Sequence, residues 1–307
     1  MKTLEVDVLI PCFNEEIAIG QTILEVQKVL PSARILVIDN NSTDTTSNIA
    51  KSLGAEVVFE RQRGKGFALA RGFNEIRDEC QVICVLDGDA TYSVNELDQA
   101  VEIVREQNVA MVVGTRIDLT PKKTAYPKMH VFGNWTFKMI NKFAIDLKID
   151  DPLSGYRVLS RGFVRSFTGG ATQFEIEAEL NSHARTLSCE IVNIEVGYRS
   201  RPEGSASKLR TISDGLSILK MYISSFYNIR PLFAFSLTSI FPLAIGVGLL
   251  WRAFSVYLQT QQVPNFPSLI VGIGLVGFAV NLVIGGLVLS RIRSIQIAIV
   301  RDRYNTK

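Results

Sequence analysis

The chain has few of the side chains that most often do metal or nucleophilic chemistry, since its 307 residues include four cysteines and two histidines. Disulfide scaffolds are short and dense in cysteine, so this chain is not one of them. Cys80 and Cys84 lack the C-x-x-C spacing of a zinc site, and we expect buried, reduced thiols. His130 and His183 lie in no motif, so we expect packing or surface roles for both.

Charge is scarce in one stretch of the chain. Among 33 basic and 30 acidic residues, only Arg252 falls between positions 231 and 290. Within that stretch, 232–251 and 268–289 are uncharged, and about 20 apolar residues are enough to cross a bilayer. We therefore predict a transmembrane hairpin at 231–290. Two buried helices of a soluble core are the weaker alternative.

The segment after this hairpin differs in charge from the loop between its two spans. Residues 291–307 carry a net charge of +4, whereas the connecting loop has a single arginine. Positive residues favour the cytoplasmic side, so we predict a basic cytoplasmic tail at 291–307 and a multi-pass protein of the inner membrane. Acids at positions 5 and 7 argue against a signal peptide. Residues 1–230 sum to −2, which argues against a nucleic-acid-binding face.

Short apolar runs alternate with segments of helical periodicity in the first half of the chain. This alternation predicts βαβ units and a mostly parallel, Rossmann-like sheet, with Ser93 and Glu96 spaced as a capping box. The predicted strands are 4–10, 34–38, 56–59, 81–86, 110–113 and 190–196, and the predicted helices are 15–30, 42–53, 64–76, 93–106, 129–144 and 174–185.

Apolar residues share one helical face just before the hairpin. Ile212, Leu216, Leu219, Ile223 and Phe226 recur at helical spacing, which is typical of a helix lying in a membrane interface. Packing on the soluble core is the alternative. The predicted domains are therefore a catalytic domain at 1–210, an amphipathic juxtamembrane helix at 211–230, the hairpin at 231–290 and the tail.

Polar side chains follow the first two predicted strands. The first strand leads into Pro11–Glu15 and the second into Asp39–Asp44. In open α/β sheets, ligands bind beyond such strand ends. The carboxylate of Asp39 accepts hydrogen bonds and suits a base or a ribose, although capping of the next helix is the favoured interpretation of this residue alone.

The segment Arg63–Gly66 precedes a predicted helix. Its glycines admit close approach of a ligand, the helix N-terminus favours anions, and Lys65 adds a positive charge. The sequence is neither a Walker A nor a G-x-G-x-x-G motif, so a surface turn is an equally good interpretation.

Two carboxylates follow the fourth predicted strand, in the sequence Asp87-Gly-Asp89. Residues i and i+2 of an extended chain face the same side, so the two carboxylates converge. Paired oxygen ligands suit Mg²⁺ or Mn²⁺ bridging a diphosphate. We favour this metal site over a solvated turn.

Taken together, these motifs resemble glycosyltransferase family 2, whose members have a GT-A fold. Further segments resemble the acceptor segments of the polyprenyl-phosphate branch, which includes dolichyl-phosphate mannose synthases and GtrB-type enzymes. The resemblance covers about residues 4–215. The matching stretches are Ile10–Glu15, Asp39–Asp44, Gly64–Gly66, Asp87–Asp89, Val113–Arg116, Asp151–Arg157 and Arg201–Leu209.

The resemblance implies a role for each matching residue. It places Asp87 and Asp89 on a metal at the sugar-nucleotide diphosphate, and Arg201 on that diphosphate or on the acceptor phosphate. Asp151 is implied as a base, an orienting group or a structural residue. The implied nucleotide-sugar residues are Pro11, Phe13, Asn14, Glu15, Asp39, Lys65 and Asp87, and the implied acceptor-phosphate residues are Arg116, Ser154, Arg157 and Lys208.

The sequence departs from the family pattern at several positions. Asn40 and Asn41 replace the common Asp and Gly, Thr91 stands where dolichyl relatives often carry Gln, and Asp150 stands where some carry Arg. A different metal shell, a different donor or a missing phosphate contact would follow from these changes.

The resemblance implies an inverting glycosyltransferase that moves a sugar from a UDP- or GDP-linked donor to undecaprenyl or dolichyl phosphate. Mg²⁺ or Mn²⁺ is the implied cofactor, and the paired spans allow a homo-oligomer. The alternatives are a family 2 enzyme with a soluble or polysaccharide acceptor, a silent membrane scaffold, and a nucleotidyltransferase.

Overall fold

The computed structural model describes residues 6–107, 109–119, 148–170, 176–204, 220, 223–224, 226–262 and 265–305. The chain divides into two compact units, which are Met1–Tyr222 together with Val300–Lys307, and Ile223–Ile299. We call them the catalytic unit and the hairpin unit. Lys208, His130, the predicted helix at 129–144 and most of the predicted juxtamembrane helix lie outside the described residues.

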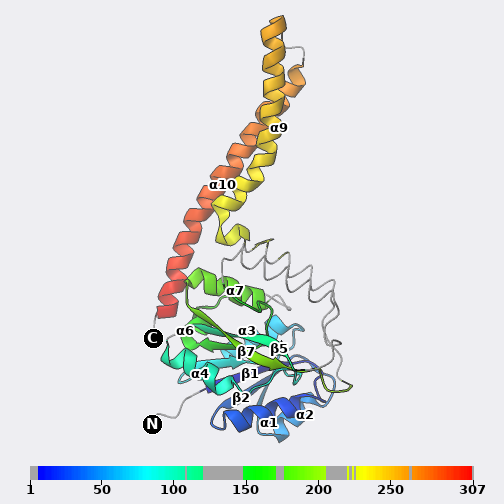
Figure 1. The fold of residues 1–307 in the computed structure, drawn as a ribbon, viewed down its shortest axis with the longest axis vertical. Coiled ribbons are helices and arrows are strands. Elements are labelled where there is room, and N and C mark those ends of the chain that lie inside the picture. The colour runs from blue at the N-terminus through cyan, green and yellow to red at the C-terminus, as the bar shows by residue number, and fades with distance from the viewer. Residues whose placement is uncertain are drawn as a thin grey trace. The chain divides into compact units, whose positions relative to one another are not determined.

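The catalytic unit is an α/β sandwich, as the alternating pattern predicts (Figure 1). Its strands are β1 (Val6–Cys12), β2 (Arg34–Asp39), β3 (Glu56–Phe59), β4 (Val82–Val85), β5 (Met111–Asp118), β6 (Arg157–Ser160) and β7 (Ile191–Tyr198). Its helices are α1 (Ile19–Val29), α2 (Thr46–Ser52), α3 (Lys65–Asn74), α4 (Leu97–Glu106), α6 (Arg161–Ser166) and α7 (Ile176–Leu187).

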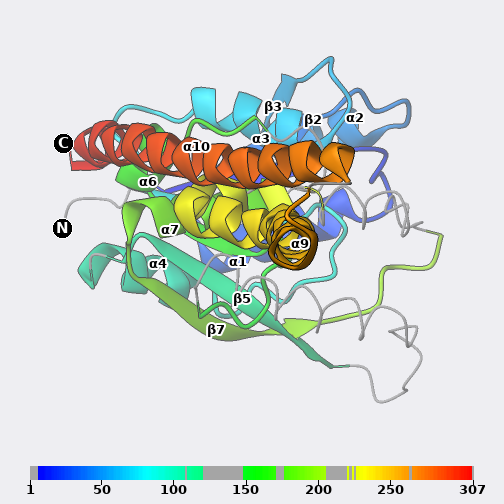
Figure 2. The ribbon, with the colours of Figure 1, turned by 90° about the horizontal axis from the view of Figure 1, so that it is seen from above.

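The sheet has seven strands in the order β3-β2-β1-β4-β6-β5-β7. All of them run parallel except β6, which pairs antiparallel with β4 and β5. The eight-residue strands β5 and β7 run side by side at one edge (Figure 2). The predicted mostly parallel sheet is confirmed, whereas β6 was not predicted because its four residues carry no distinctive alternation.

Side chains of successive residues in β1 enter different cores. Val8 and Ile10 belong to a cluster that packs against α1, α2 and α4, whereas Leu9 belongs to a cluster on the side of α3, α6 and α7. Both faces of the sheet are therefore covered by helices, which explains why neighbouring residues of β1 on opposite faces, such as Val8 and Leu9, are both apolar.

The start of α4 corrects one prediction. The helix begins at Leu97, and its N-cap residue Glu96 makes no side-chain capping bond. The capping box expected at Ser93 and Glu96 does not form, because Ser93 lies in an extended segment whose amide bonds Gly197 O. A side-chain cap is found instead at α6, where Ser160 Oγ accepts from Phe163 N at 3.3 Å.

The hairpin unit is built from two long apolar helices. They are α9 (Pro231–Thr260) and α10 (Phe266–Asn305), and both are long and apolar enough to cross a membrane. They pack closely, since a Cβ added to Gly246 would lie 3.0 Å from the carbonyl oxygen of Gly272. Small residues commonly permit such approach of membrane helices.

Helix α10 runs through the predicted basic tail. Its 40 residues span about 60 Å at ~1.5 Å per residue, about twice the ~30 Å of a hydrocarbon core. The last residues of the helix belong to the catalytic unit, where Val300 and Tyr304 pack against the core cluster beneath α3, α6 and α7. Arg301 also donates to Ser188 Oγ at 3.0 Å.

Candidate active site

The loops after β1 and β2 are fastened to each other. The backbone amide of Asn14 donates to Ser42 Oγ at 3.0 Å, and Asn14 Oδ1 accepts from Thr43 N at 2.7 Å. Asn14 also has a positive φ of 52°, which asparagine tolerates better than most residues. These two motifs therefore form one joined platform at the carboxyl ends of their strands.

Asp39 lies at the end of β2 on this platform. Its Oδ1 accepts from Ser42 N at 3.0 Å and its Oδ2 accepts from Ser47 Oγ at 2.6 Å. The N-cap of α2 is Thr45, so Asp39 supports the loop before the helix and does not cap the helix directly. Each carboxylate oxygen has a second lone pair, which leaves capacity for a ligand. On the same platform, the guanidinium of Arg63 lies 5.0 Å from the ring centroid of Phe13.

Lys65 begins α3 and bridges two carboxylates. Its Nζ lies 2.5 Å from Asp87 Oδ1 and 2.6 Å from Glu177 Oε1. Burial opposes a charge on the lysine, but the two carboxylates raise its pKa well above the ordinary value. Lys65 therefore stays a cation and holds Asp87 in place.

Glu177 is a site residue that the sequence motifs missed. It lies in the first turn of α7, and only 7% of its side chain is exposed. Its signal in the sequence is a run of alternating glutamates at 175, 177 and 179, and nothing in that run separates Glu177 from its neighbours. Its contact with Lys65 joins α7 to the D-x-D pair.

Asp89 is more enclosed than Asp87. Its Oδ1 accepts from Thr91 N at 3.1 Å and from Thr91 Oγ1 at 2.6 Å, and its Oδ2 lies 2.6 Å from Arg201 Nη2. Burial and the neighbouring Asp87 raise the pKa of Asp89, while Arg201 and Thr91 act in the opposite direction. Thr91 stands where dolichyl relatives often carry Gln, and its two hydrogen bonds hold the carboxylate of Asp89 in place.

The D-x-D loop requires its central glycine. A Cβ added to Gly88 would lie 2.5 Å from Cys12 Sγ, closer than real Cβ atoms approach. Cys12 is buried, and burial together with nearby carboxylates raises the pKa of its thiol well above the ordinary value. The thiol is thus a packing group under the loop, as predicted for the cysteines.

The donor set fits a divalent cation. Among the described residues no group of three or more His, Cys, Asp or Glu side chains forms a complete cage. Mg²⁺ is commonly bound by one or two carboxylates, with substrate phosphates and water as further ligands. Asp87 and Asp89, which lie close enough for Asp87 to affect the pKa of Asp89, match that pattern.

Arg116 and Asp151 form a two-pronged ion pair. Arg116 Nε lies 2.5 Å from Asp151 Oδ2, and Arg116 Nη2 lies 2.8 Å from Asp151 Oδ1. The guanidinium also lies 5.4 Å from the ring centroid of Tyr198. Asp151 orients Arg116 in this conformation, which favours the orienting interpretation of Asp151 over that of a base.

Arg157 is buried at the start of β6. Only 1% of its surface is exposed, and its guanidinium donates to Ser154 O, Pro152 O and Asn181 Oδ1 at 2.8 to 3.1 Å. These bonds hold the 151–157 segment in shape, and the acceptor-phosphate contact predicted for Arg157 stays a prediction. Ser154 is also buried, and its predicted phosphate contact stays a prediction.

Arg201 joins the two ends of the site. Besides Asp89, its guanidinium reaches Glu15 Oε1 at 3.3 Å, so it connects the loop after β7 with the loop after β1. The structure therefore brings together the predicted residues around the D-x-D pair. Lys65, Arg116 and Arg201 are the cations of this cluster, and Glu15, Asp87, Asp89, Asp151 and Glu177 are its anions.

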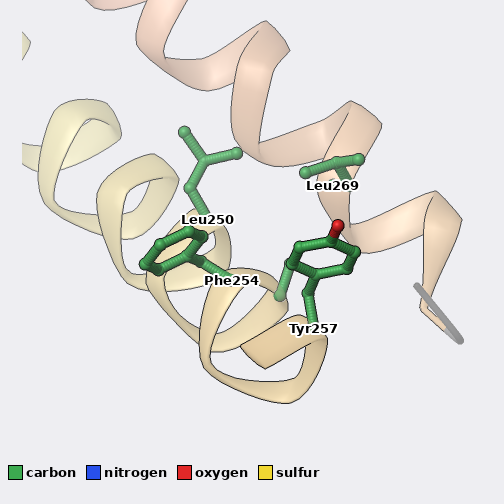
Figure 3. A pocket seen from close by; sticks show the side chains of 5 residues that line it. Leu250, Phe254, Tyr257 and Leu269 are labelled. Atoms are coloured by element: carbon green, nitrogen blue, oxygen red, sulfur yellow. The ribbon is translucent and has the colours of Figure 1, made fainter. Parts of the chain in front are cut away.

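The hairpin unit has an apolar cavity of a different kind. It is an open pocket of about 420 Å³, lined by Leu250, Ala253, Phe254, Tyr257 and Leu269. Figure 3 shows Leu250, Phe254 and Tyr257 of α9 facing Leu269 of α10. Four of these five side chains are hydrocarbon, and the hydroxyl of Tyr257 is the one polar group among them.

Comparison with known proteins identifies the family. Residues 7–167 match the model of Glycosyl transferase family 2, which is more than half of the chain. This chain is a member of glycosyl transferase family 2. It is a glycosyltransferase of the nucleotide-sugar-dependent kind, and the predicted GT-A-like α/β fold is confirmed.

Two relatives come from Haloferax volcanii. The glycosyltransferase AglJ is 29% identical over 89% of this chain and 91% of its own length. A dolichyl-phosphate hexose transferase is 24% identical over 70% of this chain and 91% of its own length. The name of the second relative agrees with the predicted resemblance to the polyprenyl-phosphate branch.

A solved structure shares the fold. Glucosyl-3-phosphoglycerate synthase from Mycobacterium tuberculosis, in complex with Mn²⁺, UDP-glucose and phosphoglyceric acid, superposes with a TM-score of 0.58 at 18% identity. The match covers 73% of this chain and 80% of that one.

Proposed function

We propose that this family 2 enzyme is membrane-anchored and transfers a sugar, with inversion, from a UDP- or GDP-linked donor to a polyprenyl phosphate. The observation that carries the proposal is the combination of a D-x-D pair held by Lys65 and Arg201 with two apolar helices in the same chain. The name of the dolichyl-phosphate hexose transferase supports a lipid acceptor.

In the proposed reaction, a phosphate oxygen of the acceptor attacks the anomeric carbon of the donor. A bond forms between that oxygen and the anomeric carbon, and the bond from the anomeric carbon to the nucleoside diphosphate breaks. A phosphomonoester is largely a dianion at neutral pH, since its second pKa is about 6. The nucleophile therefore needs little help from a base, which agrees with the pairing of Asp151 to Arg116.

The residues of the site divide the remaining tasks. Asp87 and Asp89 would hold Mg²⁺ or Mn²⁺, which supplies Lewis-acid neutralisation of the leaving diphosphate when bound. Pro11, Phe13, Asn14, Glu15 and Asp39 border the nucleotide in this proposal. Arg116, Lys208 and Ser154 orient the acceptor phosphate, and Arg201 contacts the diphosphate or the acceptor phosphate, because cations stabilise phosphoryl oxygens.

The membrane helices explain how such an acceptor is reached. The phosphate of a polyprenyl phosphate lies at the bilayer surface, so an enzyme that uses it gains from anchoring. The excess of arginine at 291–307 supports a cytoplasmic catalytic unit in the inner membrane. Single cysteines placed at positions 262 and 307 test this orientation. We expect a membrane-impermeant thiol reagent applied outside spheroplasts to label only the first.

The function is tested with the purified full-length chain in nanodiscs. It is incubated with radiolabelled UDP-glucose, UDP-N-acetylglucosamine or GDP-mannose and with undecaprenyl phosphate, with and without EDTA. We expect EDTA-sensitive label in the lipid fraction. Label in a water-soluble or polymeric product supports a different acceptor, and no turnover of any donor supports a silent scaffold.

A further inference from the structure

Tyr92 follows the D-x-D pair and has no role in the site so far. The residue is 5% exposed, and its ring lies 5.9 Å from the ring of Tyr156 and 5.2 Å from the ring of Tyr198, measured between centroids. The three rings come from the loop after β4, the acceptor segment before β6 and the end of β7. Tyr92 therefore packs where three segments of the site meet.

The hydroxyl of Tyr92 bonds the acceptor segment. Its oxygen accepts from Gly155 N at 3.0 Å and lies 3.4 Å from Ser154 Oγ. Burial raises the pKa of Tyr92 above its ordinary value. Ser154 Oγ also accepts from Tyr156 N at 3.3 Å. The Tyr92 hydroxyl therefore lies between the amide of Gly155 and the hydroxyl of Ser154.

The backbone that Tyr92 holds touches the metal pair. A Cβ added to Gly155 would collide with the carboxylate of Asp87, so the glycine backbone lies directly against that group. The amide bonded by Tyr92 belongs to the same residue. The position of Gly155 relative to Asp87 thus depends on the Tyr92 hydroxyl, whose described hydrogen bonds go to Gly155 and Ser154.

We propose that Tyr92 is a positioning residue that fixes the Ser154–Gly155 backbone of the acceptor segment against Asp87. The proposal deepens the proposed function and rests on it, because it assigns the 151–157 segment to the acceptor side. Tyr92 acts through Gly155 and Ser154, so its loss should alter use of the acceptor more than binding of the nucleotide.

The test compares Tyr92→Phe with Tyr156→Phe in the full-length chain. Both variants keep the ring and remove one buried hydroxyl. The hydroxyl of Tyr156 is a matched control, because it has no hydrogen-bond partner among the described residues and its ring belongs to the core cluster under α1 and α4.

Hydrogen exchange tests the geometry without any substrate. Loss of one buried hydrogen bond should speed amide exchange of a peptide covering 151–157 about fivefold to tenfold in Tyr92→Phe, with no change in Tyr156→Phe. Equal exchange in the wild type and both variants overturns the proposal, even when the wild type is an active enzyme.

Kinetics test the role. In Tyr92→Phe we expect kcat/KM for undecaprenyl phosphate to fall about fivefold to tenfold, while the affinity for UDP with Mn²⁺ stays within about twofold. Equal losses for donor and acceptor, or an unchanged acceptor KM and kcat, overturn the proposal. A wild type that glycosylates no lipid phosphate overturns the proposed function, an outcome that the exchange measurement separates from a failed Tyr92 contact.

Discussion

The two halves of the site are built in different ways. In the proposed donor half, which comprises the loops after β1, β2 and β4 with Lys65, Asp87 keeps 26% of its side chain exposed, although its neighbour Asp89 is buried. In the proposed acceptor half, which comprises Arg116 and 151–157, the side chain of Arg116 is 16% exposed, whereas Ser154 and Arg157 are buried and bond the backbone of their own segment. Within one site, a motif residue can thus present a charged group or can shape the backbone.

The largest effect is expected in the donor half, from Asp89→Asn. Removing one of two carboxylate ligands should lower transfer at least about 100-fold and weaken Mn²⁺ binding, measured by label transfer and by electron paramagnetic resonance of the free ion. Asp78→Asn is the matched control, because the side chain of Asp78 is fully exposed. Normal transfer by the Asp89 variant would remove the metal role from this half.

Gly155→Ala tests whether the two halves depend on each other. The added methyl group collides with Asp87, and overpacking of this kind displaces neighbouring groups. We expect transfer to fall about tenfold or more, with weaker Mn²⁺ binding as well. Gly170→Ala is the control, since nothing lies within 4 Å of a Cβ there. An unaffected Mn²⁺ affinity would show that the halves are independent.

Arg157→Ala separates a folding role from a phosphate contact in the acceptor half. Removing a buried, hydrogen-bonded guanidinium should lower the free energy of unfolding by about 3 kcal/mol, seen as a lower Tm of the full-length protein. Arg165→Ala, at an exposed position of α6, should leave Tm unchanged. An unchanged Tm for Arg157→Ala, with a raised KM for the acceptor, would instead support the predicted contact with the acceptor phosphate.

The smallest effect concerns His183, which lies outside both halves. Burial lowers its pKa from 6.5 to about 4, and its Nε2 lies 2.9 Å from Ser166 Oγ. The unfolded chain takes up a proton below about pH 6.5 and the folded chain does not, so stability falls with pH through the window from about 6.5 to 4.

At pH 5.5 this loss should be about 1 kcal/mol relative to pH 7.5, measured as a fall in Tm. In His183→Gln that part of the pH dependence should disappear. A variant with the same pH dependence as the wild type would assign the loss to other groups.

The sequence predicted most of the sheet and the donor half, because both depend on local signals. Apolar runs mark buried strands, and polar residues directly after them mark the carboxyl edge, as Asp39 and Asp87 show. Glu177 and Tyr92 were missed because their partners, Lys65 and Gly155, are far away in the chain. The charge of Arg157 suggested a ligand, whereas β-pairing of its segment with β4 places it inside.

The packing of Val300 and Tyr304 on the catalytic unit has a consequence for biogenesis. A ribosome makes the chain from its N-terminus, so these two side chains, at the end of α10, are synthesised after α9 and after the uncharged stretch 268–289. The core beneath α3 and α6 therefore gains its packing against Val300 and Tyr304 after the rest of that core has been made. In the membrane-anchored enzyme proposed above, this packing would follow synthesis of both spans, so folding of the catalytic unit would finish only after the anchor had been made.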